Sequence, residues 1–340
     1  MRAHSIVVTA AAVLLGLASS APAQAPAAPY DFAGGTIRFL VGNAAGGVAD
    51  TEMRLVARHI VNHLPGDPTV VIQNLPGAGG ARMLEFMAQL DPVTEHAIAQ
   101  ISSAIPFQAR AAALDGVFDP RTASWVGGFL RSTSICVVGR LSDIETVADL
   151  YDRDATFGGL AATGTTAANY AILSRGLGLR INPIYGYDTI GSLALAVARG
   201  EIDGTCGPYS AYPVTFAPLI ETGDLKLLLY IGAEERTDIA APYAYDFPLV
   251  EGQADFFEAI KAAVGFARPL AIPAGADPAY VAAMRIAFDE MIADPAFIAE
   301  AATLNIDLRY RSPAELGAMT AALYATPQPL VDEIRAFLFE

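Results

Sequence analysis

The sequence predicts an α/β protein of two lobes, each a mostly parallel sheet flanked by helices, with a cleft between them. Two blocks of alternating strand and helix patterns carry this prediction, one over residues 36–101 and one over 134–231. Alternation of this kind is typical of parallel sheets covered on both faces. The chain of 340 residues is long enough to bury two separate cores.

The first block predicts three strands and two helices. Strands are expected at 36–42, 69–74 and 97–101, the segments TIRFLVG, TVVIQN and AIAQI. Between them, apolar residues recur every three or four positions, which is the period of a helix with one buried face. These residues are Met53, Val56, Ala57, Ile60, Val61 and Leu64 in the first helix, and Met83, Phe86, Met87 and Leu90 in the second. Pro65-Gly66 is expected to end the first helix.

The second block repeats this pattern. Strands are expected at 134–139 (SICVVG), at the start of the segment ATFGGLAATGTTAANYAIL, from Ile202, and at 225–231 (LKLLLYI). The helix that precedes Ile202 carries its apolar residues on one face. They are Ile190, Leu193, Ala194, Val197 and Ala198.

The last third begins with an expected strand at 263–272 (AVGFARPLAI) and then becomes helical. Asp277 and Asp294 each precede a proline, which is the pattern of a helix cap followed by proline at the first helical position. Ser312 and Glu315 have the spacing of a capping box. Two α/β blocks joined by extended strands, followed by a helical C-terminus, therefore predict two lobes and a cleft.

Composition and charge exclude several classes of function. Hydrophobic residues make up 53% of the chain and charged residues 17%, which argues against disorder. The formal net charge of −15 argues against a nucleic-acid-binding surface, because that needs clustered positive charge. The same charge gives no broad attraction for an anion, so any anion site must rely on local donors.

The first 25 residues have the pattern of a cleaved secretory signal peptide. Arg2 supplies the positive start, residues 6–17 the apolar core, and residues 23–25 (AQA) the cleavage motif. A membrane anchor is the alternative, but the apolar core is shorter than the roughly 18–20 residues that a spanning helix needs. No cysteine adjoins the cleavage motif, so no lipid anchor is indicated. We expect the mature protein to be exported and soluble.

Three glycine-containing turns, at 43–50, 75–80 and 161–166, each follow an expected strand and precede an expected helix. Free N–H groups at a helix start favour a carboxylate or phosphate, and glycine lets the backbone approach it closely. One such turn is more simply a tight connection, but three favour a shared ligand crevice. The turn at 76–83 (PGAGGARM) lacks the lysine of a P-loop and has Arg82 in place of the last glycine of a dinucleotide motif.

Several single residues have both a structural and a functional interpretation. Asp50 fits the N-cap of the first helix and also a ligand contact, directly or through water. His59 and His63 have a spacing that can bind zinc, but Ile60 replaces the glutamate of the metalloprotease motif, so a solvated helix face is favoured. Ser102-Ser103 follows the third strand, where a residue of the cleft is expected. No residue near it in sequence is a candidate general base for a serine nucleophile.

Cys136 and Cys206 are the two cysteines of the chain. In an oxidising compartment they could pair, and the alternative is two separate buried thiols in strands. The sequence does not give the distance between them, so both states stay open.

Four segments together resemble the substrate-binding proteins of tripartite tricarboxylate transporters, the Bug or TctC-like receptors. They are NAAGGVADTEMRLVARHI, LPGDPTVVIQNLPGAGGARM, ATGTTAANY and GYDTIGSLALAVARGEIDGTC. The most specific parts are the G-G-x-x-D-x-x-x-R turn at Gly46, Gly47, Asp50 and Arg54 and the N-x-P-G-A-G-G turn; the resemblance runs from about residue 35 to the end of the chain.

The resemblance implies a periplasmic binding protein of the two-lobed, type II Venus-flytrap fold. Lobe 1 would comprise 26–134 and 236–340, and lobe 2 would comprise 135–235. The protein would capture a small carboxylate, act as a monomer and deliver its ligand to membrane permease subunits, without a cofactor or enzymatic activity. The lobes would close on the ligand. Two alternatives remain, an exported hydrolase that uses Ser102 or Ser103, and a sensor for a membrane kinase.

In that family, backbone N–H groups of two loops in the first lobe and one in the second hold the ligand carboxylates, partly through ordered water. The matching candidates are Asn43, Ala44, Gly46, Gly47, Asp50, Pro76, Gly77, Ala78, Gly79, Gly80, Thr163, Gly164, Thr165 and Thr166. Further candidates are Ser102, Ser103, Tyr187 and Asp188. Many relatives have proline or phenylalanine at positions 43–44, Gly-Ser at 165–166 and lysine at 188, and the change to Asp188 bears on the identity of the ligand.

The export prediction can be checked directly. Cleavage at the AQA motif is expected to give a mature N-terminus at Pro26 or within a few residues of it. Intact-mass measurement of the soluble protein after expression in a bacterium with a periplasm would show this. Soluble protein that retains residues 1–25 would contradict the prediction.

Overall fold

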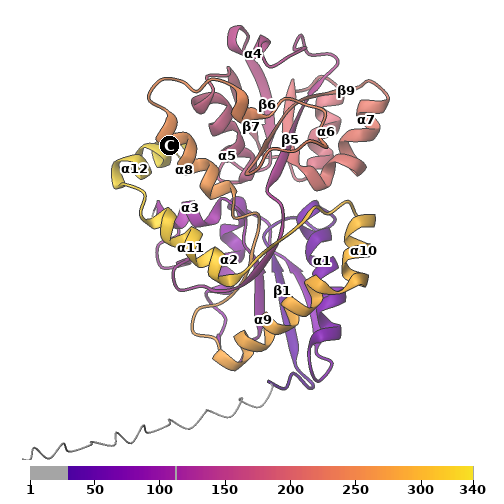
Figure 1. Cartoon of the computed structure of the whole chain (residues 1–340), viewed down its shortest axis with the longest axis vertical. Coiled ribbons are helices and arrows are strands. Elements are labelled where there is room, and N and C mark those ends of the chain that lie inside the picture. Colours follow the sequence, from indigo (N-terminus) through magenta and orange to yellow (C-terminus); the bar gives the residue numbers. More distant parts are fainter. Residues whose placement is uncertain (1–29, 112, 340) are drawn as a thin grey trace, which may run out of the picture.

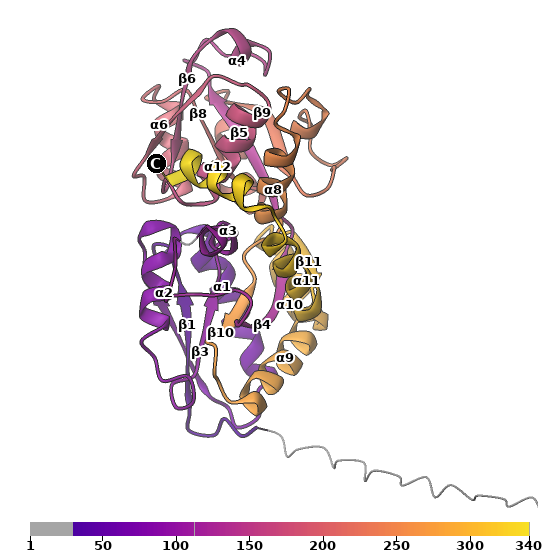
Figure 2. The same ribbon diagram turned by 90° about the vertical axis from the view of Figure 1, so that its left-hand side faces the viewer.

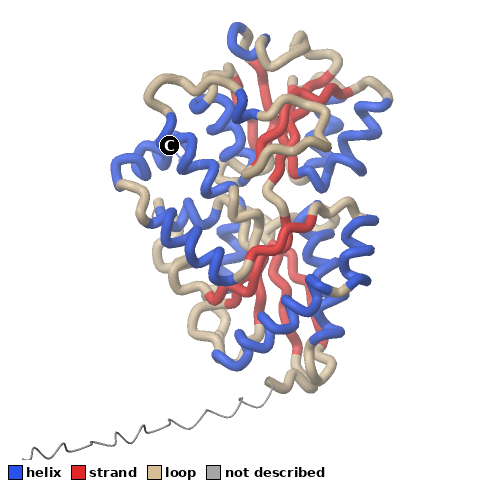
Figure 3. The backbone as a smooth tube through the Cα atoms, in the orientation of Figure 1, coloured by secondary structure: helices blue, strands red, loops and turns tan. Residues whose placement is uncertain are grey.

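The structure of the protein is a computed structural model that describes residues 30–111 and 113–339. The predicted signal segment at 1–25 lies outside the described residues. Figure 1 shows two lobes stacked along the long axis, and Figure 3 shows the strands at the centre of each lobe with helices around them. The expected two-lobed α/β fold is confirmed.

The first lobe contains a six-stranded sheet in the order β11-β4-β10-β3-β1-β2. Its strands are β1 (Thr36–Val41), β2 (Thr69–Asn74), β3 (Ala97–Gln100), β4 (Ser124–Leu130), β10 (Leu270–Ile272) and β11 (Leu308–Arg311). Its helices are α1 (Val48–Ile60), α2 (Ala81–Met87), α3 (Ile105–Arg110), α9 (Pro278–Ala293), α10 (Pro295–Thr303) and α11 (Pro313–Tyr324).

The second lobe contains a five-stranded sheet in the order β7-β6-β8-β5-β9. Its strands are β5 (Thr133–Gly139), β6 (Ala155–Gly159), β7 (Ile181–Tyr185), β8 (Gly204–Pro208) and β9 (Leu225–Gly232). Its helices are α4 (Asp149–Asp152), α5 (Thr165–Ala171), α6 (Ile190–Ala198), α7 (Ala217–Glu221), α8 (Ala254–Val264) and α12 (Gln328–Phe339).

Both sheets are mixed, whereas mostly parallel sheets were expected. Strands β1, β2 and β3 are parallel to one another, and so are β6, β7 and β8. Strands β10 and β11 run antiparallel to their neighbours in the first lobe, and β5 runs antiparallel to both of its neighbours in the second. The parallel part of each sheet is therefore the part built from the alternating strand and helix pattern.

Alternate residues of the central strands enter different cores, as the two-residue period of a strand requires. In β1, Phe39 packs with residues of α1, α9 and α10, while Leu40 packs on the other face with residues of α2 and α3. In β5, Ile135 packs with α6, and Cys136 faces the opposite side of the sheet. The apolar runs FLV in β1 and ICVV in β5 are buried, as expected for strand segments that are covered on both faces.

The strand expected at 263–272 is only partly correct. Strand β10 covers Leu270–Ile272, and the residues before Gly265 end helix α8. The buried residues of α8 recur at helical spacing, and they are Phe256, Phe257, Ile260, Ala263 and Val264. The sequence analysis also missed β4, β7 and β11, and it extended the first helix to Leu64, whereas α1 ends at Ile60 and a single 3₁₀ turn follows.

The expected lobe boundary after residue 235 does not match the packing of the C-terminal helices. Helix α8 packs against α5 and the π-helical turn at Ile172–Gly176, and α12 packs against α5 and α8. Figure 2 shows α8 and α12 together on the second lobe. The chain therefore passes between the lobes at 131–132, at 265–269 and again at 325–327, between α11 and α12.

Cys136 in β5 lies directly opposite Cys206 in β8, and the two are joined by a disulfide. Of the two states that the sequence left open, the structure has the paired one. The bond connects neighbouring strands of the second-lobe sheet, and Cys206 also lines the cavity described next.

Candidate functional site

A cavity of about 460 Å³ lies between the lobes, and its walls come from both lobes and from two of the crossing segments. Most of the residues that the sequence analysis proposed line this cavity. They are Asn43, Ala44, Gly47, Pro76, Gly77, Ala78, Gly79, Ser102, Ser103, Gly164, Thr165, Thr166, Tyr187 and Asp188. Four proposed residues belong to the turns but are outside the lining, and they are Gly46, Asp50, Gly80 and Thr163.

The first turn is shaped by Asp50. Helix α1 begins after Gly47, so Asp50 lies in its first turn and is not the N-cap residue. Its Oδ2 accepts hydrogen bonds from the Gly46 N–H at 2.8 Å and from Arg54 Nε at 2.9 Å. Burial raises the pKa of Asp50, but these hydrogen bonds outweigh it and hold the pKa below its usual range. Asp50 therefore holds the turn, while Val48 at the start of α1 faces the cavity.

The second turn has an unusual backbone. Four successive residues have positive φ angles, and they are Gly77, Ala78, Gly79 and Gly80. A positive φ angle is uncommon for a residue with a side chain, such as Ala78. Ala78 and Gly79 begin a single 3₁₀ turn, where N–H groups have no acceptor within the helix. Runs of residues with such backbone form concave anion sites in other proteins.

The first two turns pack closely against each other. A Cβ on Gly42 would lie 2.8 Å from the Gly80 Cα, so glycine is required at this contact. The Asn74 side chain donates a hydrogen bond of 3.0 Å to the Asn43 carbonyl oxygen. The sequence analysis assigned no role to Gly42, because the contact joins residues that are far apart in the chain.

The third turn meets the first lobe across the cavity. Thr165 Oγ1 lies 2.8 Å from Ser103 Oγ, and the Thr163 carbonyl oxygen accepts a hydrogen bond from the Gln108 side chain. A Cβ on Gly79 would lie 2.7 Å from Thr163 Oγ1. The lobes are therefore in direct contact through the residues that surround the cavity.

Glu52 is a buried carboxylate in the cavity wall that the sequence analysis missed. Its Oε1 accepts from Arg268 Nη2 at 2.6 Å and from Ser210 Oγ at 3.1 Å, and its Oε2 accepts from Gln100 Nε2 at 3.2 Å. Burial raises the pKa of Glu52, and the three donors offset this only in part, so the pKa stays above its usual range. Since Ser210 belongs to the second lobe, Glu52 joins α1 to the opposite wall and to the crossing segment.

The crossing segment that carries Arg268 has a strained backbone. Ala267 and Arg268 have φ angles of 53° and 56°, which are unfavourable for residues with a Cβ by roughly 1–3 kcal/mol each. Both residues line the cavity. Strain of this kind persists where surrounding contacts fix the backbone, and the Glu52 ion pair is such a contact.

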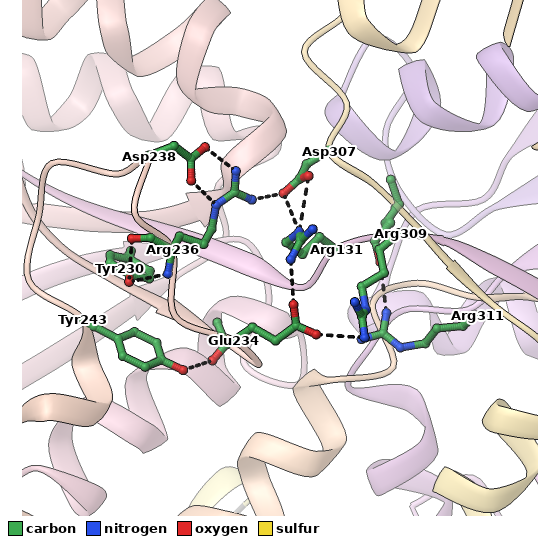
Figure 4. A network of polar contacts seen from close by, with 11 residues as sticks. Arg131, Tyr230, Glu234, Arg236, Asp238, Tyr243, Asp307, Arg309 and Arg311 are labelled. Carbon is green, nitrogen blue, oxygen red and sulfur yellow. Dashed lines mark hydrogen bonds and ion pairs between the residues drawn. The ribbon is translucent and has the colours of Figure 1, made fainter. Parts of the chain in front are cut away.

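A network of ion pairs lies where the lobes meet, as Figure 4 shows. Arg131, in the first crossing segment, lies 2.6 Å from Glu234 and 3.2 Å from Asp307. Glu234 also pairs with Arg309 at 2.8 Å, and Asp307 pairs with Arg236. The network thus ties a loop of the second lobe, after β9, to residues at β11 of the first lobe.

The same network reaches the cavity wall. Arg131 and Asp307 line the cavity, and so does Tyr209, whose ring lies 4.3 Å from the Arg236 guanidinium carbon. A change in the relative position of the lobes would therefore disturb both the ion pairs and the cavity.

The described histidines do not build a metal or catalytic site at the cavity. His59 is buried against Phe297 and lies 2.6 Å from Glu300, and His63 lies near Glu290 and Asp294, so the expected solvated helix face is wrong for His59. No cluster of metal-binding side chains occurs in residues 30–111 and 113–339. None of the described histidines lines the cavity beside Ser102 and Ser103.

The fold is that of two-lobed solute-binding proteins. Similar solved structures include a TctC solute binding protein from Polaromonas, with 18% identity, 88% of this chain and 98% of that chain covered, and a TM-score of 0.60. Periplasmic binding protein BugD has 16% identity, 89% and 97% coverage and a TM-score of 0.68. MatC from Rhodopseudomonas palustris, solved with bound malate, has 17% identity, 87% and 98% coverage and a TM-score of 0.68.

No family model and no curated protein matches the sequence. In the part of the chain that the structure describes, no helix combines the length and apolar character needed to cross a membrane.

The contact between Gly79 and Thr163 gives a test of the second turn. A valine at position 79 would strain the left-handed backbone and place its Cβ against Thr163, so the turn would move and the lobes could not approach as they do. We expect Gly79→Val to weaken binding of a carboxylate about ten- to a hundred-fold, as for the loss of a charge-assisted hydrogen bond.

Calorimetry on variants shown to be folded by circular dichroism would measure this effect. His63→Ala is the matched control, because His63 lies against Glu290 and Asp294, away from the cavity lining. A folded Gly79→Val that binds like the parent would show that the turn has no part in the site.

The Glu52–Arg268 pair gives a test of stability against pH. The raised pKa means that folded Glu52 holds a proton more tightly than the unfolded chain does, so stability falls as the pH rises between the usual and the raised pKa. Arg268→Met removes an attraction that lowers this pKa. We expect a loss of about 3–5 kcal/mol in the free energy of unfolding near neutral pH, because an unpaired charge is left buried.

The loss is expected to be smaller near pH 4, at or below the usual glutamate pKa of about 4.3. Urea unfolding at both pH values would measure it. Arg153→Met, which removes an exposed ion pair to Asp143, is the control and should change stability by less than about 1 kcal/mol at either pH. An equal loss for Arg268→Met at both pH values would count against this role of Glu52.

Proposed function

We propose that this protein is a periplasmic receptor that captures a small organic acid and delivers it to a tripartite tricarboxylate-type membrane transporter. The observation that carries the proposal is the convergence of three glycine-containing turns, from both lobes, on one interlobe cavity. Two of these turns belong to the first lobe and one to the second, so a ligand held by all three would favour the closed arrangement of the lobes.

The chemistry of the cavity supports binding of a carboxylate through the backbone. The starts of α1 and of the 3₁₀ turn at Ala78–Gly80 supply N–H groups without acceptors in their own helices, and glycine permits the close approach. The cavity volume of about 460 Å³ suits a small organic acid together with ordered water. MatC, which has a similar fold, was solved with bound malate, which is a carboxylate.

The proposal includes export through the predicted signal peptide, action as a monomer, and docking to permease subunits. It includes no cofactor and no catalytic step. Ser102 and Ser103 remain the candidates for the competing hydrolase, but the described histidines are absent from the cavity lining, so no histidine base is supplied there.

A panel of mono-, di- and tricarboxylates tests the proposal on purified mature protein. We expect the melting temperature to rise with at least one acid, since a ligand at a hundred times its Kd stabilises the folded state by about 2.7 kcal/mol. Proton NMR of the same mixtures should show the acid unchanged. Small-angle scattering should give a smaller radius of gyration with the bound acid.

Three other outcomes would contradict the proposal. Conversion of an acid or its ester at the rate of an enzyme would favour the hydrolase. Absence of any stabilisation across the panel would remove the carboxylate site. Deletion of the chromosomal copy that abolishes gene induction by the acid but leaves its uptake intact would favour the sensor.

A further inference from the structure

The charges that line the cavity are paired, with one exception. Arg268 pairs with Glu52, and Arg131 pairs with Glu234 and Asp307, so neither arginine is left to neutralise a ligand carboxylate. Asp188 is exposed and lines the cavity without an ion pair to any described residue. Among the described lining residues, the one charge without compensation is therefore negative.

Asp188 lines the cavity from the second lobe, and two of the three glycine turns line it from the first lobe. Asp188 belongs to the second lobe and precedes Thr189, whose side chain caps α6 through a capping box with Ser192. This cap fixes the segment, so Asp188 is held at the edge of a regular element. Its neighbour Tyr187 also lines the cavity.

A second polar group in the same wall lacks a partner. Asn169 of α5 is 1% exposed and lines the cavity, and its Oδ1 has no hydrogen-bond donor among the described residues. A buried amide oxygen without a donor costs free energy unless a ligand or water supplies one. The second-lobe wall thus carries two acceptors, the Asp188 carboxylate and the Asn169 amide oxygen, in addition to its own glycine turn. The two glycine turns of the first lobe present N–H donors.

We propose that the ligand of this cavity is a small carboxylate that also carries a protonated amine, with the amine held at Asp188. The inference rests on the proposed function and names the ligand class for the same site. The carboxylate of such a ligand lies at the first-lobe turns, and its ammonium group neutralises Asp188. A dicarboxylate in the same pose would place its second negative charge against Asp188. The described lining has no unpaired cation that could offset this repulsion.

Closure of the lobes strengthens this discrimination. An exposed aspartate gains little from a cation in water, but the ion pair becomes stronger when closure removes solvent from around it. Like charges brought together in the same space repel for the same reason, so the wrong ligand opposes closure.

The test uses straight-chain acids of three to six carbons in three matched series: dicarboxylates, ω-amino carboxylates and plain monocarboxylates. Calorimetry at pH 7.5 would compare each series on the mature parent, Asp188→Asn and Asp188→Lys. At the best-fitting length we expect the amino carboxylate to bind the parent at least about tenfold more tightly than the dicarboxylate, the effect of one charge-assisted contact.

Asp188→Asn should remove most of this preference, and Asp188→Lys should reverse it in favour of the dicarboxylate. Monocarboxylate affinity should change less than threefold in Asp188→Asn, a difference of less than about 0.7 kcal/mol. Asp152→Lys is the charge-matched control, because Asp152 is exposed in α4 and lies outside the cavity lining, and it should bind like the parent. Circular dichroism would establish that every variant is folded.

Two outcomes would overturn the inference alone. One is tighter binding of dicarboxylates by the parent, and the other is an amine preference that survives unchanged in Asp188→Lys. In either case carboxylate binding persists, so the proposed function stands. If no acid of any series binds the parent, the proposed function fails and the inference fails with it.

Discussion

The buried ion pair between Glu52 and Arg268 is the contact on which the arrangement of the cavity depends. It connects the first helix of one lobe to a strained crossing segment, and the hydrogen bond from Ser210 extends it to the other lobe. A buried pair of this kind adds little net stability, because desolvation offsets the attraction. Its consequence is geometric, because separation from Arg268 would leave the Glu52 charge buried without its cation. The arrangement of the three segments that keeps the pair together is therefore favoured.

The crossings also explain why the sheets are mixed. Strand β4 leads directly into β5 of the other lobe, and the chain returns through Arg268 into β10. Strands β5 and β10, which follow these crossings, run antiparallel to their neighbours. Strands β1, β2 and β3, which are linked by helices of one lobe, run parallel. Strands β1, β2 and β6 end at the glycine turns, and the crossing segments place Arg131 and Arg268 beside the same cavity.

Local sequence patterns were sufficient for the two lobes, and most of the site residues proposed from sequence line the cavity. Turns rich in glycine, helix caps and apolar stripes depend on residues near one another in the chain, so Gly77 and Gly79 could be proposed as site residues from sequence. Glu52, Arg268 and Asn169 could not, because their roles come from contacts between distant segments. Arg268 was further hidden by a run of apolar residues that resembles one strand but divides between α8 and β10.

Neither the net charge of the molecule nor the charges that line the cavity provide free positive charge to attract an anion. A chain with a formal net charge of −15 repels an anion at long range, and the arginines at the cavity are already paired within the protein. The proposed acid ligand would therefore be held by N–H groups at the turns, whose interactions act only at short range. In the proposed site, selectivity would come from the second-lobe wall, which carries the unpaired Asp188 carboxylate and a buried Asn169 amide oxygen without a donor. In the proposed function, the glycine turns would capture the carboxylate, and Asp188 would set the choice among carboxylates.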